Sequence, residues 1–182
     1  MKKFLIVLGV LVVIIAVSVL FYCSYIGMFT KINITEQPMG PFYFVYAPYK
    51  GDYSKVGPVM DKVRARLESE FGIKPMRAMG IYYSDPKTVK TEDLKADVGF
   101  LLEKSYETLA DSIMKKMWVR IMFQKNYVVA EFPMKNKASI MAGIMKVYPE
   151  VTKYMRLKGY KSVPAIEIYE KDKIIYAFEI KQ

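Results

Sequence analysis

The sequence has no histidine and a single cysteine, Cys23, among its 182 residues. These absences exclude Ser-His-Asp and Cys-His catalytic arrangements, zinc sites built from cysteine and histidine, and a disulfide within the chain. The sequence also has no glycine-rich phosphate loop, basic arm or aromatic RNA-binding signature. We therefore expect no metal, no cofactor and no nucleic-acid partner, and any chemistry has to rest on carboxylates and tyrosines.

The charge is unbalanced but not concentrated in one segment. Lysine and arginine number 28 against 18 aspartates and glutamates, which gives a formal net charge of +10. Basic and acidic side chains are interspersed along most of the chain, a pattern typical of a solvated surface. A basic surface also suits anionic lipid, so a membrane partner stays open.

One long apolar run is present near the N-terminus, from Phe4 to Tyr22. Its length is close to the roughly 20 residues that a helix needs to cross a bilayer. No small-residue cleavage site follows the run, which favours an anchor over residues 1–29 rather than a removed signal peptide. Lys2 and Lys3 precede it and only Lys31 follows closely. The positive-inside rule then predicts an extracytoplasmic soluble part.

The rest of the chain divides into a short linker and one domain. Residues 30–41 contain Pro38, Gly40 and Pro41 and few hydrophobic side chains, as expected of a linker. Residues 42–182 have the length of one ordinary domain. Apolar spacing predicts strands over 42–49, 79–83, 96–102, 118–123 and 127–132, helices over 54–71 and 137–157, and a hairpin over 163–180. Pro149 is expected to kink or break the second helix.

The domain contains an internal repeat. Residues 43–63 align with residues 127–147 without a gap, so that Tyr43 meets Tyr127 and Val63 meets Val147. Both copies continue through a helix into a strand that ends in tyrosine, Tyr83 in the first copy and Tyr169 in the second. The order strand, helix, strand, strand occurs twice, which predicts an α+β fold. We expect one curved antiparallel sheet with two helices on one face and a groove on the other, preceded by a single transmembrane helix.

Glu167 stands out in the first strand of the hairpin. Side chains alternate along a strand, so Ile166 and Ile168 share one face while Glu167 and Tyr169 share the other. A buried carboxylate would need a hydrogen-bond donor or a cation. The alternative is that Glu167 faces water. If the helices cover the two isoleucines, Glu167 lies in the open groove.

These features together resemble a known family. The repeat order, the YKGDY turn at 49–53, the IYYSDP segment at 81–86 and IEIY at 166–169 resemble the GyrI-like (SOUL/GyrI) small-molecule-binding domain over residues 42–181. A membrane helix before such a domain is similar to a membrane-anchored autophagy receptor family of the endoplasmic reticulum and its bacterial relatives.

The resemblance implies a ligand site. In that family a glutamate of the penultimate strand lies at the base of an aromatic-lined cleft that takes cationic, hydrophobic ligands, and Glu167 is the matching position. Tyr169, Tyr83 and Trp118 are our candidates for the lining, because aromatic faces attract cations. No residue is assigned a catalytic role or a metal.

The predicted function is that of a membrane-anchored protein that binds an amphipathic, aromatic or cationic small molecule above Glu167. Two alternatives remain. Some GyrI-like proteins hydrolyse strained electrophilic compounds, and Glu167 could serve as the general base, although the sequence offers no second catalytic partner. The chain could also be a non-catalytic adaptor whose basic surface lies on anionic lipid.

Overall fold

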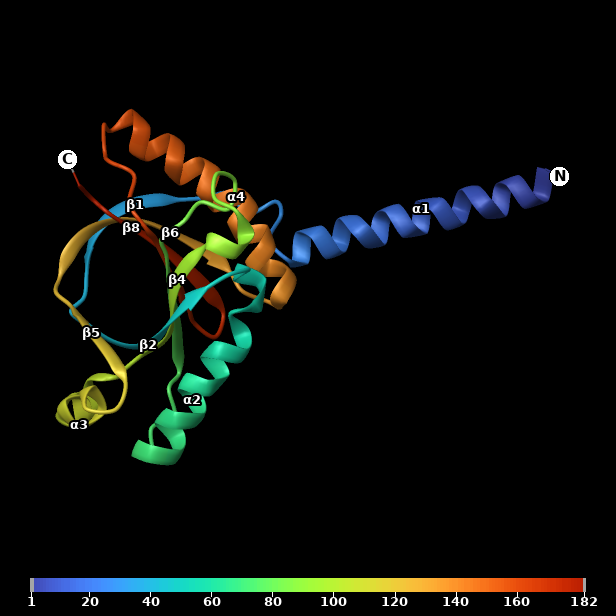
Figure 1. The fold of residues 1–182 in the computed structure, drawn as a ribbon. Helices are drawn as coiled ribbons and strands as arrows, with labels where there is room; N and C mark the ends of the chain where they lie inside the picture. The colour runs from blue at the N-terminus through green and yellow to red at the C-terminus, as the bar shows by residue number, and fades with distance from the viewer. Residues whose placement is uncertain (1, 182) are drawn as a thin grey trace.

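The computed structural model describes residues 2–181, without the side chains of residues 104 and 107. A long helix, α1 (Lys2–Tyr25), projects from a curled antiparallel sheet that has helices packed on its outer face (Figure 1). The strands are β1 (Ile34–Met39), β2 (Phe42–Lys50), β3 (Arg77–Tyr82), β4 (Lys95–Leu101), β5 (Trp118–Met122), β6 (Lys125–Pro133), β7 (Ala165–Tyr169) and β8 (Lys173–Glu179). The other helices are α2 (Gly57–Phe71), α3 (Ala110–Met114) and α4 (Lys137–Leu157), with short 3-10 turns at Tyr53–Lys55, Thr91–Asp93 and Lys104–Leu109.

The order of the strands confirms the internal repeat and the predicted fold class. The eight strands lie in the order β1-β6-β8-β7-β3-β4-β2-β5. Exchanging β1 with β5, β2 with β6, β3 with β7 and β4 with β8 gives the same order read backwards. The sheet therefore has an approximate twofold relation between β3 and β7. The full repeat is strand, strand, helix, strand, strand, one strand longer than the unit expected from the sequence.

The outer strand of each half pairs with the other half. β1 pairs with β6, and β5 pairs with β2. Two residues join β1 to β2 and two residues join β5 to β6, although each pair lies at opposite sides of the sheet. These connections touch: a Cβ atom on Gly40 would lie 3.3 Å from the carbonyl oxygens of Met122 and Phe123. The two margins of the sheet therefore meet at one end, and the sheet curls into a half-barrel.

Residues 30–41, expected to be a linker, include the edge strand β1. Its ladder with β6 runs from Ile34 opposite Ala130 to Met39 opposite Lys125. The residues between its ends are all exposed, and Pro38 lies within it. Proline is tolerated on an edge strand, where one side makes no ladder bonds. Such a polar strand has the composition of a linker, and only its long-range pairing identifies it.

The helix boundaries are set by local caps. The helix expected from residue 54 begins as α2 at Gly57, because Ser54 lies in the preceding 3-10 turn, where its backbone N–H donates to the Asp52 carboxylate at 2.9 Å. α2 ends before Gly72, which adopts a left-handed conformation (φ 66°). α4 begins after Asn136, whose side chain accepts hydrogen bonds from the amides of residues 138 and 139. Pro149 lies within α4 and does not break it.

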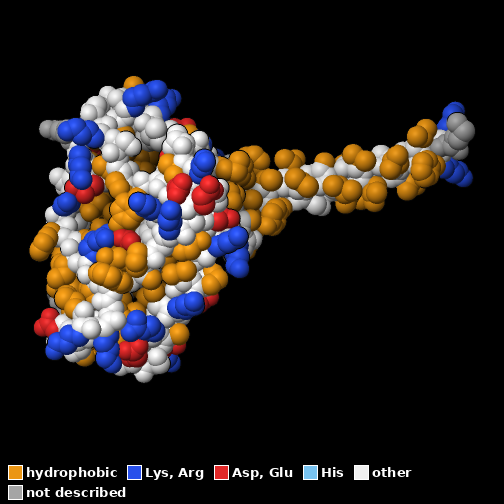
Figure 2. Space-filling view, viewed as in Figure 1, with side chains coloured by type: hydrophobic (Ala, Val, Ile, Leu, Met, Phe, Trp, Pro, Cys, Tyr) orange, Lys and Arg blue, Asp and Glu red, His pale blue; other side chains and the backbone are white. Residues whose placement is uncertain are grey.

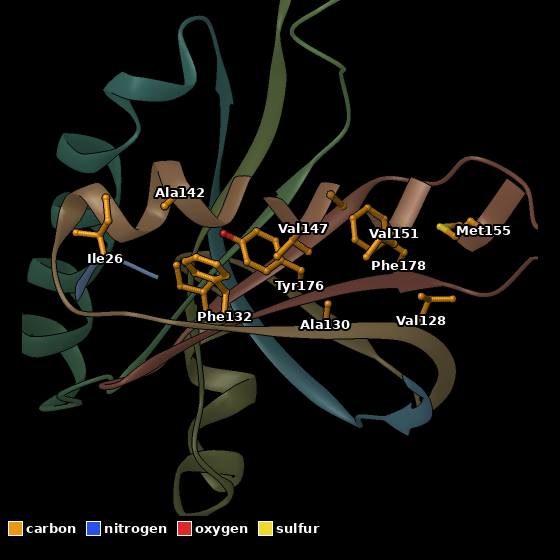
Figure 3. Packing of buried hydrophobic residues seen from close by; sticks show 12 residues of the cluster. Ile26, Val128, Ala130, Phe132, Ala142, Val147, Val151, Met155, Tyr176 and Phe178 are labelled. Atoms are coloured by element: carbon orange, nitrogen blue, oxygen red, sulfur yellow. The ribbon is translucent and has the colours of Figure 1, made fainter. Parts of the chain in front are cut away.

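The two helices cover the outer face of the sheet, and the inner face holds its own core. α4 packs over the β6, β7 and β8 side chains that point outward, such as Phe132, Tyr176 and Phe178 (Figure 3). α2 covers the equivalent face of β2 and β4. Ile166 and Ile168 belong to the inner core. The helices therefore cover the face that carries Glu167, and the expected arrangement, with the isoleucines beneath the helices, is wrong.

Candidate functional site

Glu167 lies at the centre of the sheet beneath α4. It is opposite Gly80 of β3 on one side and Tyr176 of β8 on the other. Its side chain is 2% exposed, so the alternative that it faces water is excluded, as is the open groove expected for it. Alternation in β7 correctly separated the two faces. It could not decide which face the helices cover, because alanine and tyrosine on one face are as suited to a core as the isoleucines on the other.

Two tyrosine hydroxyls bind the Glu167 carboxylate. The hydroxyl of Tyr148, a residue of α4, donates to Glu167 Oε1 at 2.6 Å. The hydroxyl of Tyr169, the last residue of β7, donates to Glu167 Oε2. Among the side chains that the structure describes, no lysine or arginine forms an ion pair with this carboxylate. A carboxylate at the centre of the fold thus has neutral hydrogen-bond donors and no counter-charge from a described side chain.

Further tyrosines complete the surroundings of Glu167. The Tyr82 ring lies over Gly80 of β3. A Cβ atom on residue 80 would lie 2.8 to 2.9 Å from atoms of this ring, so the ring occupies the space that a side chain would fill. Tyr53 packs edge-on against Tyr82 with the ring centroids 4.9 Å apart. Tyr176 is fully buried, and its hydroxyl makes no hydrogen bond to any described residue. The cluster offers aromatic faces, hydroxyl groups and one carboxylate.

Burial dominates the electrostatics of this cluster. It raises the pKa of Glu167 above its ordinary value, and the two tyrosine hydrogen bonds only partly oppose the shift. Burial also raises the pKa of Tyr148, Tyr169, Tyr82 and Tyr176, and the negative charge of Glu167 raises each further. The tyrosines therefore stay neutral. A cation brought beside Glu167 would supply the missing counter-charge and favour the ionised carboxylate.

Comparison with known proteins identifies the family. The sequence matches the family model of the GyrI-like small molecule binding domain over residues 30–174. The chain belongs to the GyrI-like family. The match begins before β1, which agrees with β1 being part of the folded sheet.

Two curated relatives share the GyrI-like chain's sequence over most of its length. The testis-expressed protein 264 homolog of Mus musculus is 24% identical over 162 residues, which are 84% of this chain and 50% of the relative. Testis-expressed protein 264 of Homo sapiens is 24% identical over 177 residues, which are 92% of this chain and 54% of the relative. The chain thus spans about half the length of these relatives.

Solved structures share the fold. The EcmrR C-terminal domain superposes with a TM-score of 0.59 at 8% identity, covering 83% of this chain and 98% of that domain. An integron cassette protein from the mobile metagenome of Vibrio cholerae superposes with a TM-score of 0.52 at 12% identity, covering 84% of this chain and 97% of that one. At these identities the likeness concerns the fold.

The four residues expected to line one site lie on two faces of the sheet. Glu167 and Tyr169 come together under α4. Tyr83 lies at the inner face, where its hydroxyl donates to Asp97 Oδ2 at 2.6 Å and accepts from Arg120 Nη1 at 2.7 Å. Trp118 lies at the inner margin of the edge strand β5 and is 65% exposed. Tyr83 and Trp118 therefore cannot share a cavity with Glu167 in this structure.

Three tyrosines near Glu167 were not predicted from the sequence, namely Tyr82, Tyr148 and Tyr176. Tyr82 and Tyr169 are the last residues of β3 and β7. Gly80 and Glu167 lie directly opposite each other in these strands, and each tyrosine comes two residues after one of them. The repeat thus equates Tyr169 with Tyr82, whereas the sequence alignment paired it with Tyr83. A slip of one residue in a strand moves a side chain to the other face. Tyr148 and Tyr176 had no comparable signal, because their approach to Glu167 depends on how α4 and β8 pack.

Proposed function

We propose that this GyrI-like chain is a membrane-anchored protein that binds an amphipathic small molecule with a cationic or aromatic group at Glu167. The carrying observation is a carboxylate, 2% exposed, that is held by two tyrosine hydroxyls and has no cationic partner among the described residues. A desolvated carboxylate next to phenol rings favours a cation, and aromatic faces add attraction of about 0.5 to 2 kcal/mol. The description of the family as a small molecule binding domain supports the same function.

The ligand would enter by displacing tyrosine side chains. Glu167 is enclosed by the rings and hydroxyls of its neighbours, so a ligand has to take the place of one of them. Tyr148 and Tyr82 lie at the outside of the cluster, on α4 and at the end of β3, and both are partly exposed. We infer that these two side chains move aside, while Tyr169 and Glu167 remain on the rigid strand β7.

The membrane part of the proposal depends on α1. This helix is long and apolar enough to cross a bilayer by length and composition, and none of its residues is buried in the domain. Lys2 and Lys3 are its first two residues and precede its apolar run, which supports an extracytoplasmic position for the domain by the positive-inside rule.

Two ions of matched shape and opposite charge test the ligand site. The full chain in non-ionic detergent is unfolded thermally with tetraphenylphosphonium or with tetraphenylborate. We expect the phosphonium cation alone to raise the melting temperature of the wild type. At 100 times its dissociation constant a ligand stabilises the folded state by about 2.7 kcal/mol. Glu167→Gln should lose the response because the carboxamide carries no charge.

A matched control removes a different carboxylate of the same sheet. Glu131 of β6 is exposed and bonds only to Lys173 at 2.7 Å among the described residues. Glu131→Gln should keep the full response to the cation. An equal response to both ions, or an undiminished response in Glu167→Gln, would show that Glu167 does not bind the ligand.

A further inference from the structure

The membrane helix is joined to the domain by packing. α1 ends at Tyr25, and the next residue, Ile26, is only 9% exposed because it enters the core beside Phe132 and Ala142 (Figure 3). The helix is capped at this point: Ile26 N still donates to Tyr22 O at 3.0 Å, whereas Gly27 N donates to Ser24 O at 3.1 Å and Met28 N donates to Cys23 O at 2.9 Å, the pattern of a helix that ends at a left-handed glycine. The last turn of the helix thus ends against the hydrophobic core.

Two further contacts fix this joint. Gly27 adopts φ +92°, and a Cβ atom there would lie 2.8 Å from the Phe132 ring and 2.9 Å from Pro133 Cγ, so only glycine permits the close approach. Lys146 of α4 donates from Nζ to the carbonyl oxygen of Met28 at 2.6 Å. Because both β6 and α4 hold the joint, α1 has one direction relative to the domain.

This direction places one exposed face of α4 near the end of α1. Lys137, Met141 and Met145 recur at four-residue spacing and so share a helix face. Met141 is 59% exposed and Met145 is 62% exposed. Phe29, in the turn after α1, is 65% exposed. α1 leaves the domain beside the first half of α4 (Figure 1), and hydrophobic side chains continue from α1 onto the adjoining surface of the domain (Figure 2).

We propose that this face of α4, with Phe29 beside it, rests in the headgroup layer of the membrane that α1 crosses. The inference rests on α1 being a membrane anchor, as in the proposed function. Apolar side chains with lysines at the rim are the composition of helices that lie in a bilayer interface. Lys137 and Lys31, both exposed, can extend their ammonium groups to lipid phosphates while their methylene chains stay with the apolar residues.

The choice of lipid over a protein partner follows from continuity. Each exposed methionine is adjacent in sequence to a residue that packs at the end of α1, and α1 itself is surrounded by lipid if it spans the bilayer. Met141 lies one residue before Ala142, which packs near Ile26, and Met145 lies one residue before Lys146, which binds the Met28 carbonyl. A surface so close to the point where the helix leaves the bilayer meets the headgroups first.

A single-cysteine labelling experiment on the full chain tests the inference. Cys23→Ser removes the native thiol, and Met141→Cys, Met145→Cys or Met76→Cys then places an environment-sensitive nitrobenzoxadiazole label at one position. Met76 is a matched control, since it is an exposed methionine (83%) that follows the far end of α2. Each protein is reconstituted into nanodiscs of phosphatidylcholine with a minority of phosphatidylserine.

We expect the labels at 141 and 145 to emit at shorter wavelength and to be quenched by a spin label attached high on the lipid acyl chain. The label at 76 should be quenched only by a water-soluble quencher. If the labels at 141 and 145 behave like the label at 76, the inference is overturned. Resistance of the full chain to extraction by alkaline carbonate is measured in parallel. Extraction would overturn the anchor and the inference together, whereas retention with water-exposed labels would overturn the inference alone.

Discussion

Glu167 combines two demands that are normally kept apart, an ionisable group and a fully buried position. Its requirement for hydrogen-bond donors could be predicted from the sequence, because an apolar strand that contains a carboxylate must satisfy it. The donors themselves could not be predicted. Strand alternation predicts that Tyr169 lies on the same face as Glu167. Tyr148 belongs to a helix and lies 19 residues earlier in the chain, so no local pattern connects it to Glu167. Its hydroxyl reaches Glu167 only because of the way α4 crosses the sheet.

The raised pKa of Glu167 predicts a pH-dependent stability. A carboxyl whose pKa in the folded state lies above its ordinary value of 4.5 binds its proton more tightly in the fold. Its contribution to stability is therefore complete below pH 4.5 and is lost as the pH rises from there through the raised pKa. The wild type should lose stability over this range relative to Glu167→Gln, which cannot ionise.

Denaturant midpoints of the two proteins over a pH series measure this effect. The wild-type curve should fall away from the Glu167→Gln curve as the pH rises, so that the variant is the more stable protein at neutral pH. Glu131→Gln should follow the wild type, since that carboxylate is exposed. Parallel curves for wild type and Glu167→Gln would contradict the raised pKa.

At the scale of the elements, the packing of α4 against the sheet decides the site. The extents of both helices and of most strands could be predicted from apolar spacing, because period 3.6 and period 2 differ over such lengths. The face of the sheet that the helices cover could not, since β7 has side chains suited to a core on both faces. Of the four candidate site residues, the structure therefore places Glu167 and Tyr169 together and Tyr83 and Trp118 apart from them. Tyr83 was assigned to the site through the one-residue slip that the paired register of β3 and β7 corrects.

Gly143 is the point where α4 comes closest to the sheet. A Cβ atom there would collide with the Tyr176 hydroxyl and would lie 3.1 Å from Phe132 Cδ1. Both rings are almost fully buried and have no free space to enter. Gly143→Ala should therefore destabilise the protein by about 1 to 3 kcal/mol, the usual range for overpacking.

Gly57 is the control for helix propensity. It starts α2, and a Cβ atom there would meet nothing within 4 Å. Gly57→Ala should change the free energy of unfolding by less than about 1 kcal/mol, since alanine favours a helix over glycine whereas a Cβ atom before Pro58 opposes the helical conformation. Both variants are compared by urea unfolding monitored by circular dichroism. Equal free energies of unfolding for the two would contradict the close packing of α4.

For the whole molecule, the exchange of outer strands between the two halves binds the repeats into one unit. The repeat could be seen in the sequence because both copies keep the same order of elements. The exchange could not, because pairing of β1 with β6 joins residues almost a hundred positions apart and leaves no local pattern. The sheet curls because the outer strands are exchanged, so the way in which its margins meet could not be predicted from the spacing of apolar residues either.

The exchange predicts that neither half folds alone. Residues 30–103 would contain β1 without β6, β2 without β5 and β3 without β7. Produced separately, residues 30–103 and 104–182 should unfold without a cooperative transition, whereas their co-expression should give a complex that unfolds cooperatively. Thermal unfolding followed by circular dichroism distinguishes these results. A cooperative transition in either fragment alone would contradict the interdependence of the halves.

The position of β8 has a consequence for synthesis of the protein on the ribosome. β8 lies between β6 and β7, so it is the strand that connects β1 and β6 to the remainder of the sheet. It is also the last of the eight strands to be translated. Until it emerges, β6 and β7 have no partner between them, although α1 at the other end of the nascent chain was translated first. The sheet can therefore be completed only after its final strand is translated, and until then the unpaired edges of β6 and β7 are open to aggregation.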